Sequence, residues 1–243
     1  PAEGAYYGYT LENNGANSVK FLYGTMAFDT WAVVQGVRAV NDGDWHHLAC
    51  VYDNSGTISL YIDGIHQGTS DSFTPRHAQS SINLRMMTSQ AWPGFTAGQL
   101  DEFRVWNDIR SVAEIRANMH RELQGSEANL VAYYTLDTGM GTTTALDSSG
   151  NGHDGTLTGP PAWQTSGAMS GPGNALDFDG TDDYVDCGNV GTGVKTVEFW
   201  VKPSTNTDHF LDLDSGTHFV QADTGTVTAD GFTSPTVYVN GIV

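Results

Sequence analysis

The stretch DGDWHHLACVYDNSGTISLYIDG, residues 42–64, decides the fold prediction for this chain. It holds two runs rich in apolar residues, 45–52 and 57–62. In the second run apolar and polar residues alternate, and alternation with a period of two is typical of a half-buried β-strand. The residues between the runs, 53–56, read Asp-Asn-Ser-Gly, as in a tight turn. The Asp-Gly pair at 63–64 marks a second turn. The stretch therefore predicts a β-hairpin.

Similar short runs continue along the chain, separated by clusters of Gly, Asn, Asp and Ser. Together with 29 glycines and 11% aromatic residues, this pattern indicates an all-β protein built as an antiparallel β-sandwich. Hydrophobic residues make up 39% of the chain, which is enough for a packed core. Further strands are expected at 19–24, 31–35, 99–106, 130–136, 175–178, 184–187, 196–202 and 236–239.

One helix is expected in this otherwise all-β chain. The residues SVAE at 111–114 form a capping-box pattern, and Ile115 and Met119 follow with i,i+4 spacing. The expected helix spans residues 111–123 and ends before Gly125, since glycine is a common helix stop.

The charge balance disfavours some classes of partner. The chain has 28 acidic residues against 10 Lys and Arg, a formal net charge of −18. Nucleic acid binding is not expected, because it needs a basic patch that replaces the phosphate counterions. An anionic membrane surface would repel the chain, and no run approaches the ~18 apolar residues of a spanning helix, so no membrane insertion is expected. An acidic surface does suit the binding of divalent cations.

Several of these runs resemble the laminin-G-like, or concanavalin A-like, jelly roll of many secreted and cell-surface proteins. Residues 42–64 are similar to a hairpin of that family, and LDEFRVWNDIRSVAEI at 100–115 is similar to its last strand and following helix. Between residues 130 and 203, the runs LVAYYTLDTGMG, DSSGNGHDGTLTG, LDFDGTDDYVDCG and TVEFWVKP resemble its opening strands and first loop. The resemblance implies a concanavalin A-like β-sandwich with one short helix near 111–123.

The order of these runs is permuted. In the family the opening section comes before the hairpin, whereas here it comes after it. Residues 1–125 thus resemble the C-terminal portion of a module, and residues 128–243 resemble the N-terminal portion of one. Either the chain spans the junction of two modules in a tandem array, or it is one circularly permuted sandwich, which is feasible when termini lie close together.

An isolated half of a sandwich would expose unpaired strand edges and half-covered apolar faces. We therefore expect the two segments to complete each other within the chain. The alternatives are completion between successive chains, which would build a filament or array, and two separately folded partial modules.

The loop from Leu146 to Gly155 is the best candidate for a cation site. It is rich in oxygen ligands and in glycines that free backbone carbonyls to point at an ion, and Ca²⁺ takes about six to eight such oxygens. The family resemblance implies a structural Ca²⁺ held here by Asp147, Asn151 and Asp101. The alternative is an Asx-rich turn stabilised by its own hydrogen bonds. A second acidic turn, 178–184, is expected to be a solvated hairpin turn rather than a contact for an ion or a sugar.

No catalytic residues are assigned, and the chain is not expected to be an enzyme. It lacks the Glu-rich strand of sandwich glycosidases, a nucleophile elbow, a phosphate-binding loop and a zinc protease motif. Glu102 and Glu198 are expected to be exposed on their strands. His46 and His47 are neighbours on a strand and point to opposite faces, so we expect one in the core and one outside, with no shared metal.

Aromatic residues in or near loops are candidate sugar platforms, because a ring face stacks on a pyranose. The candidate ligand-binding residues are Trp31, Trp92, Tyr6 and Tyr7. The strand tryptophans, expected in the core, are Trp45, Trp106 and Trp200.

The two cysteines, Cys50 and Cys187, allow either one disulfide or two buried thiols. They do not define a compartment, so the expected location, secreted or on a cell or virion surface, rests on the resemblance.

The preferred hypothesis is a non-catalytic extracellular adhesion or recognition module that binds glycans. It would be stabilised by Ca²⁺ and form part of a larger repetitive surface protein, with a glycan or an extracellular protein surface as its partner. The alternative is a structural or assembly subunit of an extracellular filament, matrix or virion, whose partners would be copies of itself or adjacent modules. A domain accessory to a glycosidase or protease is a third, weaker hypothesis.

Overall fold

The computed structural model describes residues 9–14, 19–24, 31–74, 83–88, 94–139, 141–159, 161–165, 167–169, 173–191, 193–205, 207–212, 219–223 and 226–230. Within these ranges the predicted alternation has produced strands. Residues 1–125 supply β1 (Tyr9–Asn14), β2 (Val19–Gly24), β3 (Trp31–Gln35), β4 (His46–Tyr52), β5 (Ile58–Ile62), β6 (Ile65–Thr69), β7 (Arg85–Met86), β8 (Ala97–Trp106) and α1 (Val112–Asn118). Residues 128–243 supply β9 (Leu130–Tyr134), β10 (Thr144–Ala145), β11 (Gly155–Thr158), β12 (Ala162–Gln164), β13 (Ala175–Asp179), β14 (Tyr184–Asp186), β15 (Thr196–Pro203), β16 (Thr207–Asp212), β17 (Phe219–Asp223) and β18 (Thr226–Asp230). The strand predicted at 236–239 lies outside the described residues.

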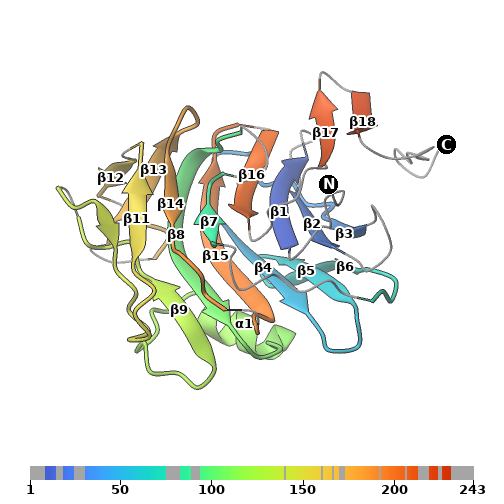
Figure 1. Cartoon of the computed structure of the whole chain (residues 1–243), viewed down its shortest axis with the longest axis horizontal. Helices are drawn as coiled ribbons and strands as arrows, with labels where there is room; N and C mark the ends of the chain where they lie inside the picture. Colours follow the sequence, from blue (N-terminus) through green and yellow to red (C-terminus); the bar gives the residue numbers. More distant parts are fainter. Residues whose placement is uncertain are drawn as a thin grey trace, which may run out of the picture.

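Two antiparallel sheets form a sandwich (Figure 1). Sheet 1 has the strand order β10-β11-β14-β7-β16-β1-β2-β3, and sheet 2 has the order β12-β13-β8-β15-β4-β5-β6. One side of the long strand β8 pairs with β13 along its first half and with β9 along its second half. Strands β17 and β18 pair only with each other. The predicted all-β antiparallel β-sandwich is confirmed.

Strands from the two segments of the chain alternate within both sheets. In sheet 2, β15 lies between β4 and β8, so that Val197 pairs with Cys50 on one side and with Val105 on the other. In sheet 1, β7 lies between β14 and β16. Each segment therefore fills strand edges that the other would leave open.

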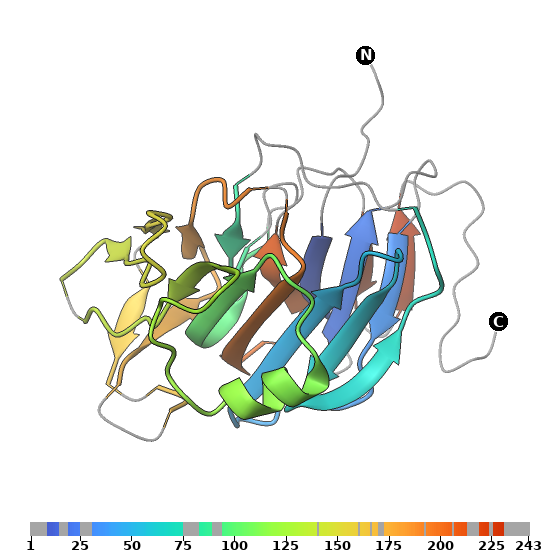
Figure 2. The same cartoon turned by 90° about the horizontal axis from the view of Figure 1, so that it is seen from below.

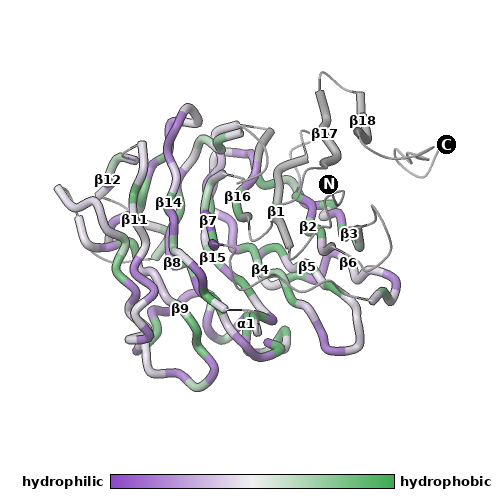
Figure 3. Tube along the Cα trace, viewed as in Figure 1, coloured by the Kyte–Doolittle hydropathy of each residue, from purple (hydrophilic) through white to green (hydrophobic). Residues whose placement is uncertain are grey.

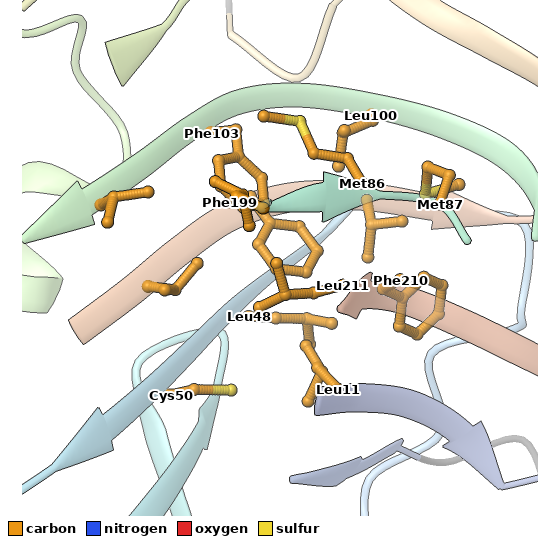
Figure 4. Packing of buried hydrophobic residues seen from close by; sticks show 14 of the residues in the cluster. Leu11, Leu48, Cys50, Met86, Met87, Leu100, Phe103, Phe199, Phe210 and Leu211 are labelled. Atoms are coloured by element: carbon orange, nitrogen blue, oxygen red, sulfur yellow. The ribbon is translucent and has the colours of Figure 1, made fainter. Parts of the chain in front are cut away.

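The core lies between the two sheets (Figure 4). The side chains that meet there include Leu11, Met86, Phe210 and Leu211 from sheet 1 and Leu48, Leu100, Phe103 and Phe199 from sheet 2. The rings of Phe103 and Phe199 stack with their centroids 5.1 Å apart. Hydrophobic and hydrophilic positions are interspersed along the strands (Figure 3), as a sheet with one face on the core requires. Cys50 and Cys187 are buried in this core as free thiols and form no disulfide.

The helix α1 begins as the sequence predicts. The hydroxyl of Ser111 accepts a hydrogen bond from the backbone N–H of Glu114, and the Glu114 carboxylate accepts one from the backbone N–H of Ser111. The helix lies across the outer face of sheet 2 (Figure 2), where Ile115 packs on Ala49 and Val51. In the described part of the chain, no helix has the length and apolar character needed to cross a membrane.

The helix is shorter than predicted, because it ends at Asn118 rather than near residue 123. The backbone carbonyl of Asn118 accepts from the buried Arg104 guanidinium at 3.0 Å and from the N–H of Arg121 at 3.1 Å, three residues on. Since this carbonyl is used in a tight turn and by a strand side chain, the next i,i+4 bond does not form.

Candidate functional site

The carboxylate of Asp147 organises the loop between β10 and β11. Its two oxygens accept hydrogen bonds from the backbone N–H groups of Tyr133 (3.0 Å), Ser149 (2.9 Å) and His153 (3.0 Å). Burial opposes ionisation, but the N–H groups of Tyr133 and His153 outweigh it, and the pKa of Asp147 is lowered. Asp147 is therefore an ionised group that is already satisfied by backbone donors.

Asn151 fastens the same loop to β9. Its side-chain amide donates to the carbonyls of Leu130 and Val131 at 2.9 and 3.0 Å. The loop also touches the segment after α1, because a β-carbon at Gly125 would lie 2.0 Å from the Ser148 carbonyl oxygen. These contacts are those of an Asx-rich turn held by its own hydrogen bonds.

Asp101 lies on β8 and is almost fully buried, at 3% exposure. Its Oδ1 accepts from the N–H of Glu102 at 2.9 Å, and its Oδ2 accepts from the N–H of Ala168 at 2.7 Å. Burial, together with the nearby carboxylates of Glu102 and Asp137, raises the pKa of Asp101 to about 8 against the effect of the two N–H donors. The carboxyl is thus poorly compensated as an anion.

Three oxygen-bearing residues converge near Gly167, and we name them the Asp101 cluster: Asp101, Asp137 and Asn174. A β-carbon at Gly167 would lie 2.3 Å from Asp101 Oδ2 and 2.7 Å from the Asn174 carbonyl oxygen, so a glycine is needed here. The N–H of Asn174 donates to the Asp137 carboxylate, and its side-chain amide donates to the Asp137 carbonyl. The cluster thus gathers two carboxylates and a backbone carbonyl, the oxygen types that hard cations bind.

The three residues predicted to share one cation do not contact one another directly. Among the residues that the structure describes, the hydrogen bonds of Asp147 and Asn151 stay within their loop and β9, whereas those of Asp101 go to Glu102 and Ala168. Asp137, which the sequence analysis did not single out, is the acidic neighbour of Asp101. Its signal was the Leu-Asp pair that ends the LVAYYTLD run, shortly after β9.

Glu102 and Glu198 are buried, which corrects the prediction that both are exposed. Glu102 is 2% exposed and Glu198 is 0% exposed. Glu102 Oε2 lies 2.6 Å from Arg104 Nη2, and Glu198 Oε1 lies 3.8 Å from Arg104 Nη1. Both side chains point to the outer face of sheet 2, but α1 and the segment after it cover that face. We name this set, Glu102, Arg104 and Glu198, the buried ion network.

Aromatic donors complete the buried ion network. The Tyr133 hydroxyl donates to Glu102 at 2.8 Å, and the indole N–H of Trp106 donates to Glu198 at 3.1 Å. Burial raises the pKa of both glutamates, although the Arg104 charge and these donors oppose the shift. A β-bulge helps to place the network: Glu102 has φ +53°, at a register shift where β8 has one residue more than β15.

Both histidines of the hairpin are buried, so the prediction of one histidine outside is wrong. His46 lies between Asp63 and Asp42, with ring nitrogens 2.9 and 3.0 Å from their carboxylates. His47 faces outward from sheet 2, but it is covered and lies 3.7 Å from Glu198 Oε2. Burial, with the Arg104 charge, lowers the pKa of His47 to about 3.

The sequence contained a signal for this covered face. Leu48, Ala49, Cys50 and Val51 form an unbroken apolar run, which is typical of a strand that is buried on both faces. The signal did not say what would cover the second face.

Comparison with known proteins gives the family. Residues 2–116 match the family model described as the concanavalin A-like lectin/glucanases superfamily, of laminin G type. No curated protein and no solved structure shows significant similarity to the chain. The match confirms the predicted laminin-G-like, concanavalin A-like resemblance, and with the two packed sheets it identifies the fold as a concanavalin A-like jelly roll.

Concanavalin A-like domains of the lectin type are in general carbohydrate- or protein-binding modules without catalysis. The predicted sugar platforms of this jelly roll cannot be placed: Trp92, Tyr6 and Tyr7 lie outside the described residues, and of Trp31 only the backbone, in β3, is described.

The strand tryptophans were expected in the core. Trp45 is half-buried, and Trp106 and Trp200 are buried, but in the covered outer layer of sheet 2 rather than between the sheets. There the Trp200 indole N–H donates to the Met119 carbonyl at the end of α1.

Proposed function

We propose that this chain is a non-catalytic recognition module of an extracellular surface, and that it binds glycans. The observation that carries the proposal is a concanavalin A-like sandwich in which the two glutamates of the outer layer are buried and share one arginine. We propose that the chain is part of a larger repetitive surface protein, which is secreted or lies on a cell or virion surface.

The buried ion network supports the non-catalytic part of the proposal. Glycoside hydrolysis uses two carboxyl groups that flank the sugar, one as an acid and one as a base or nucleophile. Glu102 and Glu198 have at most 2% exposure, and Arg104 lies between them. A sugar cannot reach this pair without removal of α1, so the network suits structural stabilisation rather than hydrolysis.

The glycan-binding part is tested on a glycan array with the full chain. We expect binding to a subset of saccharides, and we expect Trp31→Ala or Trp92→Ala to weaken it because a stacking platform is lost. Tyr61→Ala, a change on the outer face of sheet 2 beside α1, is the control and should leave binding unchanged. No binding across the array would contradict the glycan and direct the search to protein ligands.

We further propose that the module holds a structural Ca²⁺ at the Asp101 cluster. The support is a buried carboxyl whose pKa is raised by burial and by a neighbouring carboxylate, with the backbone carbonyl of Asn174 close to the same Gly167. A divalent cation would offset both charges. Thermal unfolding with EDTA and with Ca²⁺ tests this: we expect Ca²⁺ to raise the midpoint of the wild type, and to raise that of Asp101→Asn by less, because the ion at this cluster is lost. An equal midpoint in the wild type would contradict the site.

The alternative of an assembly subunit has less support. Its argument was that half-sandwiches need neighbours, whereas β15 and β7 pair with strands of the other segment inside one chain. Light scattering with size-exclusion chromatography decides between them, since a monodisperse monomer is expected for the recognition module.

A further inference from the structure

The turn between β13 and β14 brings three carboxylates together. Ligand oxygens of Asp179, Asp182 and Asp183 all lie within 4.8 Å of one another, and we name them the turn cluster. The backbone shapes the turn through two of them: Asp179 Oδ1 accepts from the N–H of Thr181 at 2.7 Å, and Asp183 Oδ2 accepts from the N–H of Asp179 at 3.0 Å. The cluster is thus held in a fixed arrangement by the main chain.

One oxygen of the turn cluster is buried and unsatisfied, although Asp179, Thr181 and Asp182 are exposed as a solvated turn requires. The turn is not the predicted hairpin turn, because β13 and β14 lie in different sheets. Asp183 is 3% exposed, and its Oδ1 has no hydrogen-bond partner within the described residues. A buried polar atom without a partner costs about 1–3 kcal/mol, and more when it carries charge. A cation bound to Asp183 Oδ1 would remove this cost.

The protein supplies no such partner in the described ranges. None of the Lys and Arg ion pairs there involves the turn cluster; the nearby Arg85, for example, pairs with Asp186 at 3.2 Å. The charges around Asp183 are negative and do not stabilise its ionised form. Burial raises the pKa of Asp183, and the carboxylates of Asp179, Asp182 and Asp177 add to this effect.

A further oxygen lies beside the unsatisfied one. A β-carbon at Gly159 would lie 2.4 Å from the carbonyl oxygen of Asp182 and 2.6 Å from Asp183 Oδ1. Both oxygens therefore pack directly against Gly159, which has φ +83° and no side chain that would push them apart. Three carboxylates and one carbonyl make a set of hard oxygen ligands from adjacent positions of the chain.

From this geometry we propose that the turn cluster is a second, separate Ca²⁺ site, with Asp179, Asp182 and Asp183 as carboxylate ligands and the Asp182 carbonyl as a further ligand. Ca²⁺ accepts irregular sets of carboxylate and carbonyl oxygens and completes its shell with water, whereas Mg²⁺ demands a near-ideal octahedron. The bound ion would satisfy Asp183 Oδ1 and tie β13 to β14. The Asp101 cluster lies at the other end of β13, so the two sites are independent.

Calcium titration of the full chain, freed of metal with EDTA, tests the proposal. Isothermal titration calorimetry gives the number of ions, and terbium luminescence sensitised by nearby aromatic rings, of which Tyr184 follows Asp183 directly, reports on bound ions; the variants assign the signal to the turn cluster. Asp182 is exposed, so Asp182→Asn should fold normally and weaken binding at this site about tenfold or more, because affinity follows the number of charged ligands. In the Asp101→Asn background, Asp183→Asn should abolish the remaining terbium signal, and Asp44→Asn, an exposed charge elsewhere, should leave it unchanged.

The outcomes separate this site from the one at the Asp101 cluster. If both sites exist, Asp182→Asn weakens the binding of one ion and Asp101→Asn that of the other. If only the turn cluster binds, Asp101→Asn changes nothing and Asp182→Asn weakens the single ion. Calcium or terbium binding that Asp182→Asn and Asp183→Asn leave unchanged would overturn the proposal. So would the absence of binding to the wild type at millimolar Ca²⁺.

Discussion

Replacing Arg104 with methionine removes the only cation of the buried ion network and keeps most of the side-chain volume. The guanidinium contacts Glu102 at 2.6 Å and donates to the carbonyls of Asn118 and Arg121 at 3.0 and 2.7 Å. Loss of one partner from a buried ion pair costs about 3–5 kcal/mol, because the remaining charge has no compensation. We expect Arg104→Met to lower the free energy of unfolding by at least about 3 kcal/mol, on the basis of that range.

Urea unfolding followed by the fluorescence of Trp106 and Trp200 measures this effect, since both rings lie in the covered layer. Arg116→Met is the matched control: its side chain is exposed and makes one hydrogen bond, to the Gly64 carbonyl at 2.8 Å, so a loss below about 1 kcal/mol is expected.

The pH dependence gives a second readout. The pKa of Glu102 is raised in the folded state, so its favourable contribution is present below the unfolded pKa of about 4.3 and is lost as the pH rises through the folded pKa. Without Arg104 the ionised Glu102 is less stable, so stability falls more steeply with rising pH. The loss of unfolding free energy in Arg104→Met should therefore be smaller at about pH 5 than at about pH 8. A deficit below about 1 kcal/mol at an unchanged denaturant slope would refute the structural role of the network.

Three further predictions follow from single residues. Asp101, whose pKa is raised to about 8 by burial, is neutral in the folded protein and ionised in the unfolded chain between its two pKa values. In EDTA the stability should therefore fall by about 1.4 kcal/mol per pH unit from about pH 4 to about pH 8, and thermal melts of Asp101→Asn that keep this slope would contradict the assignment. The hydrogen bond with Asp63 raises the pKa of His46 against the effect of burial, so its stabilisation is complete below the unfolded pKa and is lost as the pH rises through the folded pKa. His46→Gln should accordingly lose more stability in urea at about pH 5.5 than at about pH 8.5, and an equal loss at both would count against a charged His46. Gly125→Ala combines φ +78° with a β-carbon 2.0 Å from a carbonyl oxygen and should cost about 3 kcal/mol or more, whereas Gly150→Ala has the same φ and open space and should cost about 1–2 kcal/mol; calorimetry giving equal losses would rule out the close contact.

The alternation of apolar and polar residues predicted the strands well because each strand has one face on a common core. The ranges expected at 19–24 and 31–35 coincide with β2 and β3, and the capping box at Ser111 marks the start of α1. These features depend on short-range physics, namely side-chain periodicity and the unsatisfied N–H groups of a first helical turn.

The sequence was less informative where a second layer or a distant segment decides the outcome. Glu198 sits at a polar position of its strand, and periodicity states only which face it occupies, not that α1 covers that face. Asp101 and Asp137 are separated along the chain and meet through the pairing of β8 with strands of the other segment. Asp183 was expected in a solvated turn, but its exposure depends on the approach of Gly159 from β11.

The position of β15 has a consequence for biosynthesis. In sheet 2, Val197 of β15 pairs with Cys50 of β4 and Val105 of β8. Both neighbours precede β15 by many residues, so they leave the ribosome long before it does. Until β15 arrives, sheet 2 has a gap at its centre, and the apolar sides of β4 and β8 are open to other nascent chains. Closure then depends on contacts between residues far apart in sequence, which makes folding slow. A ribosome-associated chaperone, or rapid export in an unfolded state, would protect the chain during this interval.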